Sequence, residues 1–297
     1  MSRLPTWILV GAVAVLVAVA AADALRPGAE APPQQDAPEE ETELRGLLVA
    51  AGADCSARAV RLPAGAEEPV RRPVDCDGSV WSVDHTLNAS CAGEFTTVAA
   101  LDAGVLLRLR GCSPAWRPDG AVSIIDEGDL YVARRRGRPQ LVVSREELAD
   151  ALAGELPGGR QYELVEVAWH GTASFGGIVA GPQPGQRAAI FYAPEGLNAV
   201  IPRLGEDISG IRMSPAGNYL AFAREDERDY VMVDLTGGEI PLPRVENVHA
   251  IAWSDDERWV ALATPRATFV ARTGSREIAA RLELGGETLE WLGSGPR

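Results

Sequence analysis

The sequence predicts an all-β protein, a six-bladed β-propeller of four-stranded antiparallel blades, and three observations support this fold class. Short runs of β-forming residues alternate with turns rich in Gly, Pro, Asp and Ser across residues 44–297. A unit of roughly 40 residues recurs along this stretch, which is the period of a propeller blade. The first and last parts of the stretch each lack strands that the other can supply. We therefore predict that the C-terminal strand closes the ring by pairing with the N-terminal strands.

The best-formed unit spans residues 208–243. Two predicted strands, 208–213 and 219–223, flank a Ser-Pro-Ala-Gly turn in which Pro fixes φ and Gly permits a positive φ. Strands at 230–235 and 239–242 follow, separated by a Thr-Gly-Gly turn. A sheet this small cannot bury both of its faces, so it must stack on similar sheets.

A large apolar side chain marks each unit. The markers recur at intervals close to the blade period, and they are Trp81, Trp116, Trp169, Met213, Trp253 and Trp291. We interpret these side chains as the core between blades and not as a ligand cage. The predicted blades are 44–72 with 287–292, 78–110, 112–143, 162–204, 208–243 and 248–284.

Three of the turn motifs resemble a known family. They are W-R-P-D-G at 116–120, M-S-P-A-G at 213–217 and Y-V-M-V-D-L-T-G-G at 230–238, with a degraded W-S-D-D-E at 253–257. These motifs are similar to those of the TolB-like or PD40 β-propellers, which are related to WD40 repeats. The resemblance extends over residues 112–284 and implies a propeller that binds other proteins. The fold itself hosts binding proteins and enzymes alike.

The N-terminal segment is predicted to place the protein at a membrane. Residues 1–6 are expected to be a cytoplasmic stub and residues 7–24 a transmembrane signal anchor. The apolar run at 7–22 approaches the length of about 20 residues that a membrane-spanning helix needs. Arg3 precedes this run and Asp23 follows it, so we expect a single-pass protein of the cytoplasmic membrane with its propeller on the extracytoplasmic side. The alternative is a cleaved signal peptide and a secreted protein.

Residues 25–43 are rich in Pro, Gln, Ala and Glu and contain almost no large apolar side chain. Such a segment cannot bury enough surface to offset its chain entropy, so we expect a disordered acidic tether. The net charge of −14 argues against nucleic acid and against an anionic membrane surface as partners.

The propeller is predicted to begin with an incomplete blade. Residues 47–51 and 57–62 resemble strands, followed by a poor third strand around Val70. Residues 288–292 resemble the innermost strand of a blade, and they belong to none of the other predicted units. We expect this last strand to complete the first blade.

A short helix is predicted over residues 145–156, between the third and fourth blades. Ser144 begins a capping-box pattern, and Leu148, Leu152 and Leu156 share one helical face. We expect the helix to pack over the edge of the propeller, and a partner-binding element is the alternative.

The four cysteines fall into two pairs, Cys55 with Cys76 and Cys91 with Cys112, and the two pairs have the same spacing in the sequence. Export makes disulfides available. Of the three possible connectivities, we predict these local pairs because each ties neighbouring strands in the blades with the weakest motifs. A metal site is not favoured, since C-x-x-C and Cys/His spacings are missing from the sequence.

The candidate residues of the central funnel are His170 and His249, which lie close to marker tryptophans. They could form a metal-binding or catalytic pair, but we favour ordinary channel-lining or hydrogen-bonded histidines. The sequence contains no G-x-S-x-G, Walker A or dinucleotide-binding motif. We predict no catalytic residue, no metal and no cofactor.

The charged turns are the remaining candidates for a binding site. The acidic turns at 225–227 and 255–257 and the basic run at 134–138 are expected to be solvated hairpin turns. A weak calcium site at the acidic turns and an anion contact at the basic run are the alternatives.

These features favour a non-enzymatic, membrane-tethered scaffold that binds a protein or an envelope component. One alternative is an exported hydrolase or lyase with its active site in the funnel, and another is a sensor for a small ligand. An enzyme predicts convergent polar side chains in the channel, whereas a scaffold predicts a plugged channel and an exposed apolar patch on a rim.

Overall fold

The computed structural model describes residues 43–70, 72–76, 78–204, 207–224 and 229–293. From Leu44 onward these residues belong to one compact unit. The predicted stub, anchor and tether lie outside the described residues, apart from Glu43 at the end of the tether. Within the described ranges, no helix is both long enough and apolar enough to cross a membrane.

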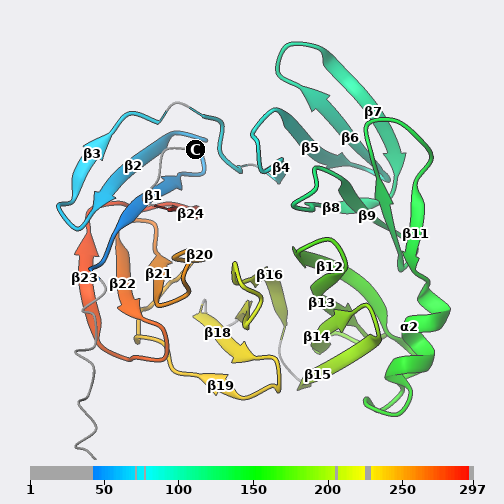
Figure 1. Cartoon of the computed structure of the whole chain (residues 1–297). Coiled ribbons are helices and arrows are strands. Elements are labelled where there is room, and N and C mark those ends of the chain that lie inside the picture. The colour runs from blue at the N-terminus through cyan, green and yellow to red at the C-terminus, as the bar shows by residue number, and fades with distance from the viewer. Residues whose placement is uncertain (1–42, 71, 77, 205–206, 225–228, 294–297) are drawn as a thin grey trace, which may run out of the picture. The chain divides into compact units, whose positions relative to one another are not determined.

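The described residues form six four-stranded antiparallel sheets set around a common centre, and the fold is all-β apart from short helices (Figure 1). Each sheet is one blade, with its strands named from the innermost to the outermost. Blade 1 contains β24 (Thr288–Leu292), β1 (Gly46–Ala51), β2 (Ala57–Leu62) and β3 (Ala66–Glu68). Blade 2 contains β4 (Ser79–Trp81), β5 (Leu87–Ala92), β6 (Phe95–Ala100) and β7 (Gly104–Arg110). Blade 3 contains β8 (Cys112–Trp116), β9 (Val122–Asp126), β10 (Asp129–Ala133) and β11 (Gln140–Val143).

The other three blades follow the same order. Blade 4 contains β12 (Glu163–His170), β13 (Ser174–Ala180), β14 (Gln186–Ala193) and β15 (Gly196–Leu204). Blade 5 contains β16 (Ile208–Met213), β17 (Tyr219–Arg224), β18 (Asp229–Asp234) and β19 (Glu239–Ile240). Blade 6 contains β20 (Ala250–Trp253), β21 (Trp259–Ala263), β22 (Thr268–Arg272) and β23 (Ile278–Leu282). All six predicted blades correspond to these sheets.

Blade 1 is assembled from two distant segments, as predicted. β24 pairs with β1 along its whole length, with Leu48 opposite Trp291. The Trp291 side chain is buried, and its indole N–H donates a hydrogen bond to the Arg45 carbonyl at 3.2 Å. The pairing of the C-terminal strand with the N-terminal strand is therefore confirmed.

Two boundaries differ from the sequence prediction. The third strand of blade 1 is β3 at Ala66–Glu68 and not a strand around Val70. Pro69 follows β3 immediately and has no N–H to donate to a neighbouring strand, so the pairing ends there. The helix α2 (Arg145–Leu152) is shorter than the predicted 145–156. Gly154 follows it closely, and glycine is a poor helix former.

Helix α2 packs over the edge of the propeller, as expected. The Ser144 hydroxyl accepts a hydrogen bond from the Glu147 N–H at 3.1 Å, which caps the helix. Leu148, Leu152 and Leu156 are buried in one apolar cluster with residues of blades 3 and 4. The helix is thus part of the core between these two blades.

Five apolar clusters occupy five of the interfaces between neighbouring blades, namely 2 with 3, 3 with 4, 4 with 5, 5 with 6, and 6 with 1. Each cluster contains, or packs against, one of the predicted markers. Trp116 lies between blades 2 and 3, Trp169 between blades 3 and 4, Met213 between blades 4 and 5, Trp253 between blades 5 and 6, and Trp291 between blades 6 and 1. For these five residues the interpretation as inter-blade core agrees with the structure.

Replacing Trp291 by Ala should lower the free energy of unfolding by about 3–5 kcal/mol, because it leaves a cavity where β24 packs against blade 6. Urea unfolding followed by circular dichroism measures this change. The control is Ile278→Ala, at a side chain that is 46% exposed, where we expect a change within about 0.5 kcal/mol. Equal unfolding midpoints for the two variants would contradict a structural role for the β24 pairing.

Candidate functional site

The interface between blade 1 and blade 2, which we call the seam, differs from the other five. Among the described residues, no apolar cluster contains side chains from both of these blades. The marker of blade 2, Trp81, is only half-buried and belongs to none of the clusters. The Trp116 indole in blade 3 donates to the Val80 carbonyl of the preceding blade at 2.9 Å. Within the described part of the chain, the Trp81 indole N–H has no corresponding bond to blade 1.

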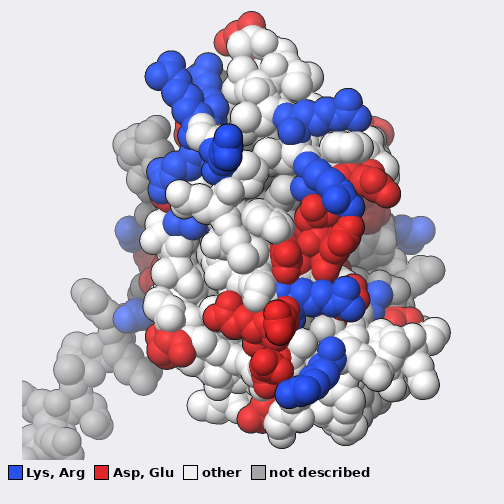
Figure 2. Space-filling model, turned by 90° about the vertical axis from the view of Figure 1, so that its right-hand side faces the viewer, with Lys and Arg blue, Asp and Glu red and all other residues white. Residues whose placement is uncertain are grey.

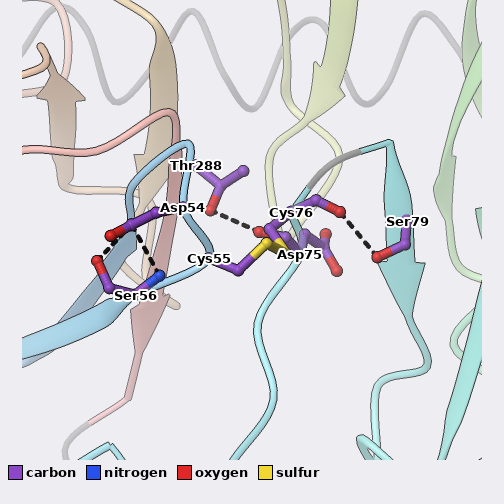
Figure 3. Close-up of a disulfide and its surroundings, with 7 residues drawn as sticks. All are labelled: Asp54, Cys55, Ser56, Asp75, Cys76, Ser79 and Thr288. Atoms are coloured by element: carbon purple, nitrogen blue, oxygen red, sulfur yellow. Dashed lines mark hydrogen bonds between the residues drawn. A yellow bond between two sulfur atoms is a disulfide. The ribbon is translucent and has the colours of Figure 1, made fainter.

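A disulfide joins the two blades instead. Cys55 lies in the turn between β1 and β2, and Cys76 lies in the segment that leads into β4 (Figure 3). Their sulfur atoms are 2.09 Å apart and their Cα atoms 5.5 Å apart. The second predicted disulfide, Cys91–Cys112, joins β5 of blade 2 to β8 of blade 3. Both predicted cysteine pairs are thus present, and each ties one blade to the next.

Polar contacts surround the seam disulfide. The Thr288 hydroxyl on β24 donates to the Asp75 carbonyl oxygen at 2.9 Å, as Figure 3 shows. The Asp75 carboxylate accepts a hydrogen bond from the Trp81 backbone N–H at 2.7 Å. Arg72 forms an ion pair with Glu290 on β24, with 2.6 Å between nitrogen and oxygen. Segments from near the two ends of the described chain therefore meet at this interface.

His85 completes this polar group. It lies in the turn between β4 and β5, where its backbone has a positive φ of 54°. Its Nδ1 is 3.1 Å from the Pro73 carbonyl oxygen, which can only accept, so Nδ1 carries a proton. Its Nε2 lies 3.9 Å from a Glu290 carboxylate oxygen. We call the group of Arg72, Asp75, His85 and Glu290 the seam cluster.

Burial shifts the ionisation of the two carboxyl groups of the seam cluster. Burial raises the pKa of Asp75, and the bond from the Trp81 N–H and the charges of Arg212 and His85 oppose this change. Burial also raises the pKa of Glu290, against the charges of Arg72 and His85, while nearby Asp75 raises it further. Carboxyl groups with raised pKa values are typical of functional sites, although structural charge networks can produce them too.

Two cavities open at the seam. The first, which we call the polar cavity, has a volume of about 450 Å³ and is bordered by the polar side chains of Arg72, Ser79 and Asn88. The rest of its lining is less polar and consists of Cys55, Ala57, Val70, Pro73, Val74, Cys76 and Trp81. The second, which we call the aliphatic cavity, has a volume of about 420 Å³, lies against blade 1 and is bordered by Leu47, Val49, Ala59, Val70 and Leu292. Val70 and Arg72 border both cavities. Both volumes are in the range of roughly 300–1,000 Å³ that is common for ligand pockets.

The two predicted funnel residues do not meet. His170 is the last residue of β12, and its ring packs against Gly217 in the first turn of blade 5. His249 directly precedes β20, and its ring contacts Glu287 and the Asn247 side chain. Each histidine thus has its own surroundings, and each contributes to contacts between adjacent parts of the fold.

One of the two acidic turns differs from the prediction at Glu257. Residues 225–227 lie outside the described residues. In the other turn, Glu257 is buried and accepts hydrogen bonds from the Ala216 N–H at 2.6 Å and the Asn218 amide at 2.7 Å. It therefore joins the turns of blades 5 and 6 and is not solvated. The described residues contain no group of three or more His, Cys, Asp or Glu arranged to hold a metal ion.

The side of the propeller that carries α2 and β11 shows charges of both signs (Figure 2). Basic side chains gather over its upper part, and acidic side chains form a band below them. The basic run from Arg134 to Arg138 is an exposed turn between β10 and β11, and Arg134 pairs with Asp119. Because this face carries both basic and acidic groups, the net negative charge does not produce a uniform acidic surface here.

The sequence did not identify the seam cluster. Arg72, Asp75 and Glu290 form no motif, and His85 was only one of three histidines. The one available signal was the incomplete first blade, because it predicts an interface built from two distant segments.

No protein-family model matches the sequence, and no curated protein sequence matches it. Solved structures do resemble the fold. Hydrazine synthase of Kuenenia stuttgartiensis aligns with a TM-score of 0.50 and 12% identity, over 81% of this chain and 87% of that one. The β-propeller domain of Cps50 (Swd1) from Myceliophteria thermophila aligns with a TM-score of 0.50 and 12% identity, over 83% and 87%. At this identity the similarity shows the fold alone, which is a β-propeller.

Removing the seam disulfide with Cys55→Ser and Cys76→Ser should lower the free energy of unfolding by roughly 3 kcal/mol, since it frees a loop of about 20 residues in the unfolded chain. The Cys91→Ser, Cys112→Ser variant is the control, because its disulfide has the same separation of 21 residues. Amide hydrogen exchange at Trp81 should accelerate more in the seam variant. Equal exchange in the two variants would contradict the role of the disulfide in ordering the seam.

The two aspartates beside the seam disulfide should respond to pH with opposite signs. The raised pKa of Asp75 means that the folded protein holds this proton more tightly than the unfolded chain. The corresponding stability is present below the ordinary pKa of about 4 and is lost as the pH rises through the raised value. Asp75→Asn, which cannot ionise, should match the wild type at low pH and become the more stable protein at neutral pH.

Asp54→Asn is the control for this pH dependence. Hydrogen bonds from Ser56 lower the pKa of Asp54, so its stabilising effect is present at neutral pH and is lost as the pH falls through the lowered value. This variant should be less stable than the wild type at neutral pH and converge with it in acid. Melting temperatures recorded across the pH range test both variants, and differences of the same sign would contradict the assignment.

Proposed function

We propose that this protein is a non-enzymatic binding protein, a scaffold whose propeller holds a protein or envelope component at the seam. The observation that carries the proposal is the seam itself. Five interfaces contain apolar clusters, whereas the described residues of the sixth form no such cluster and border two cavities lined by apolar residues and a few charged and polar groups. Concave sites with a few polar groups are the usual form of a binding site.

The other polar groups near the centre support a binding role over catalysis, because each of them contacts another part of the fold. The Glu166 carboxylate accepts hydrogen bonds from the Gly210 and Ile211 N–H groups at 2.8 and 3.2 Å. His249 contacts Glu287, and His170 packs on a neighbouring turn. A nucleophile with an adjacent base, as covalent catalysis requires, is not formed by these residues.

We further propose that the protein acts outside the cytoplasm, tethered by the apolar segment at 7–24 and the acidic segment at 25–43. Two disulfides support an oxidising compartment. The turn motifs at 116–120 and 213–217 support membership among the TolB-like or PD40 propellers. The β24–β1 pairing and the seam disulfide support a closed ring.

A hydrolase is the second candidate, because Asp75 and Glu290 both have raised pKa values and lie close to the polar cavity, which Arg72 borders. Pairs of carboxyl groups in different environments provide acid and base in many hydrolases. Both groups already have partners within the fold, namely the Trp81 N–H and Arg72. We therefore favour binding over hydrolysis.

The test is capture of partners from a crosslinked envelope extract by the full chain. Asn88→Arg places a large charged side chain in the polar cavity that Asn88 borders. Asn198→Arg makes the same replacement on β15 of blade 4 and is the control. We expect one identified partner, in near-equal amount, to be captured by the wild type and the control and to be lost with Asn88→Arg.

Equal capture by all three proteins would contradict binding at the seam. Turnover of an envelope polymer by the purified chain, abolished by Asp75→Asn, would favour the hydrolase instead.

A further inference from the structure

One face of the propeller combines exposed arginines with exposed aliphatic side chains, and this combination suits one kind of partner surface. We propose that blades 2 and 3 dock onto an anionic lipid bilayer through this face. The docking rests on the proposed membrane tether and adds to it the part of the propeller that contacts the bilayer. Three features of the described residues support it, namely the position of the chain start, the arginines and the aliphatic side chains.

The strand order determines which turns share a face. The strands of a blade are antiparallel, so the first and third turns lie at one end of the blade and the second turn lies at the other. Contacts between turns agree with this arrangement. Arg134 in the third turn of blade 3 pairs with Asp119 in its first turn, and Glu257 links the first turns of blades 5 and 6. We call the face with the first and third turns the docking face.

The described chain begins on the docking face. β1 is the second strand of blade 1, and Leu47 near its start is paired with Leu292 at the end of β24. Glu43, the first described residue, therefore leads into blade 1 at the position of a first turn. The proposed tether thus joins the propeller on the docking face, in the blade next to blade 2.

The docking face is basic over blade 3. Residues 134–138, which we call the arginine turn, are all exposed, and Figure 2 shows basic side chains gathered over the upper part of the side that carries β11. Within the described ranges, Arg135, Arg136 and Arg138 have no ion-pair partner. Asp119 is already paired with Arg117 and Arg134. In the turns of blades 2 and 3 on this face, the arginines outnumber the aspartates; they are Arg117, Arg134, Arg135, Arg136 and Arg138 against Asp84, Asp102 and Asp119.

This local charge differs in sign from the net charge of −14, which argued against an anionic membrane as a partner. Exposed charges that are separated by more than a Debye length of about 8–10 Å are largely screened at physiological salt. The arginine turn would therefore be attracted to an anionic surface largely independently of distant acidic groups. Each basic residue close to such a surface strengthens the attraction.

Exposed aliphatic side chains lie beside the arginine turn. Among the described residues, four of the five exposed large apolar side chains belong to blades 2 and 3. Val83 and Leu101 lie in the first and third turns of blade 2 and are 53% and 63% exposed. Val105 and Leu141 are the second residues of β7 and β11, the strands that follow the third turns, and they are 66% and 53% exposed. These side chains are accessible without any rearrangement of the fold.

The arginines and the aliphatic side chains form one surface, because Arg135 borders a small pocket together with Leu87 and Leu106 of blade 2. A bilayer suits both groups, since anionic headgroups pair with arginines while aliphatic side chains enter the boundary of the acyl chains. A soluble polyanion would contact the arginines and leave the aliphatic side chains in water. The combination therefore favours a lipid surface.

The test compares the full chain in vesicles of phosphatidylcholine with the full chain in vesicles made of equal parts of phosphatidylcholine and phosphatidylglycerol. Amide hydrogen exchange at residues 101–105 and 134–138 should be roughly tenfold slower in the anionic vesicles, because contact with headgroups shields these segments. Exchange at residues 181–185, the second turn of blade 4 on the opposite face, should be the same in both.

The variant that removes the basic charge carries Arg135→Gln, Arg136→Gln and Arg138→Gln, and it should lose the slower exchange at an unchanged melting temperature. The matched control carries Arg160→Gln, Arg266→Gln and Arg281→Gln, which remove three exposed arginines outside the docking face, and it should keep the slower exchange. Comparing the two variants in the same vesicles removes the effect of surface pH on exchange. Leu101→Gln should also weaken the protection, whereas Ile278→Gln, at an exposed aliphatic residue of blade 6, should not.

Equal exchange in the two kinds of vesicle, equal protection in the two arginine variants, or equal protection by soluble polyphosphate would each overturn the docking. If the full chain still floats with both kinds of vesicle in these cases, the proposed tether stands. Flotation with anionic vesicles alone, lost in the arginine-turn variant, would support the docking and contradict the tether. Flotation with neither kind of vesicle would contradict both.

Discussion

The pairing of β24 with β1 is the constraint on which the rest of the structure depends. It completes blade 1 and also fixes which side chains of β24 point to which neighbour, because successive residues of a strand point to opposite faces. Trp291 is thereby directed into the cluster with blade 6, and Glu290, one position earlier, is directed away from it towards Arg72 and His85. The register that buries Trp291 therefore places the Glu290 carboxylate at the seam. The polar character of this interface is a direct consequence of the strand pairing.

The seam is held by a disulfide and polar contacts, whereas the other interfaces contain apolar clusters. Apolar clusters stabilise in proportion to the area that they remove from water, so they are effective only when closely packed. The Cys55–Cys76 disulfide acts chiefly on the unfolded chain and does not need close packing around it. The Arg72–Glu290 pair adds only a modest amount, since the cost of removing charges from water offsets much of their attraction. A covalent link with few ionic contacts is thus compatible with the two cavities that lie beside it.

The fold could be predicted from the sequence because its signals are local and repeated. Turn motifs and regularly spaced markers identified six blades, and the unmatched strand at 288–292 identified the assembly of blade 1. The site could not be predicted, because its residues depend on where distant segments meet. Trp81 resembles the other markers in sequence, yet among the described residues it joins no apolar cluster between blades 1 and 2. Glu257 resembles a solvated turn residue, yet the turn of blade 5 surrounds its carboxylate with donors. His170 and His249 were linked only by their positions near tryptophans, which says nothing about which neighbour each ring contacts.

The seam lacks the apolar cluster that each of the other five interfaces contains among the described residues. Atoms that line a void lose their dispersion contacts on one side, and a buried donor without a partner costs free energy as well. The Trp291 side chain shows that this fold accommodates a large aromatic side chain between blades. Local departures from good packing tend to occur where a protein binds something, because a bound ligand supplies the missing contacts. The two cavities and the half-buried marker Trp81 occur at the same interface, within the described part of the chain. A ligand at the seam would supply contacts that the disulfide and the few polar contacts of this interface do not.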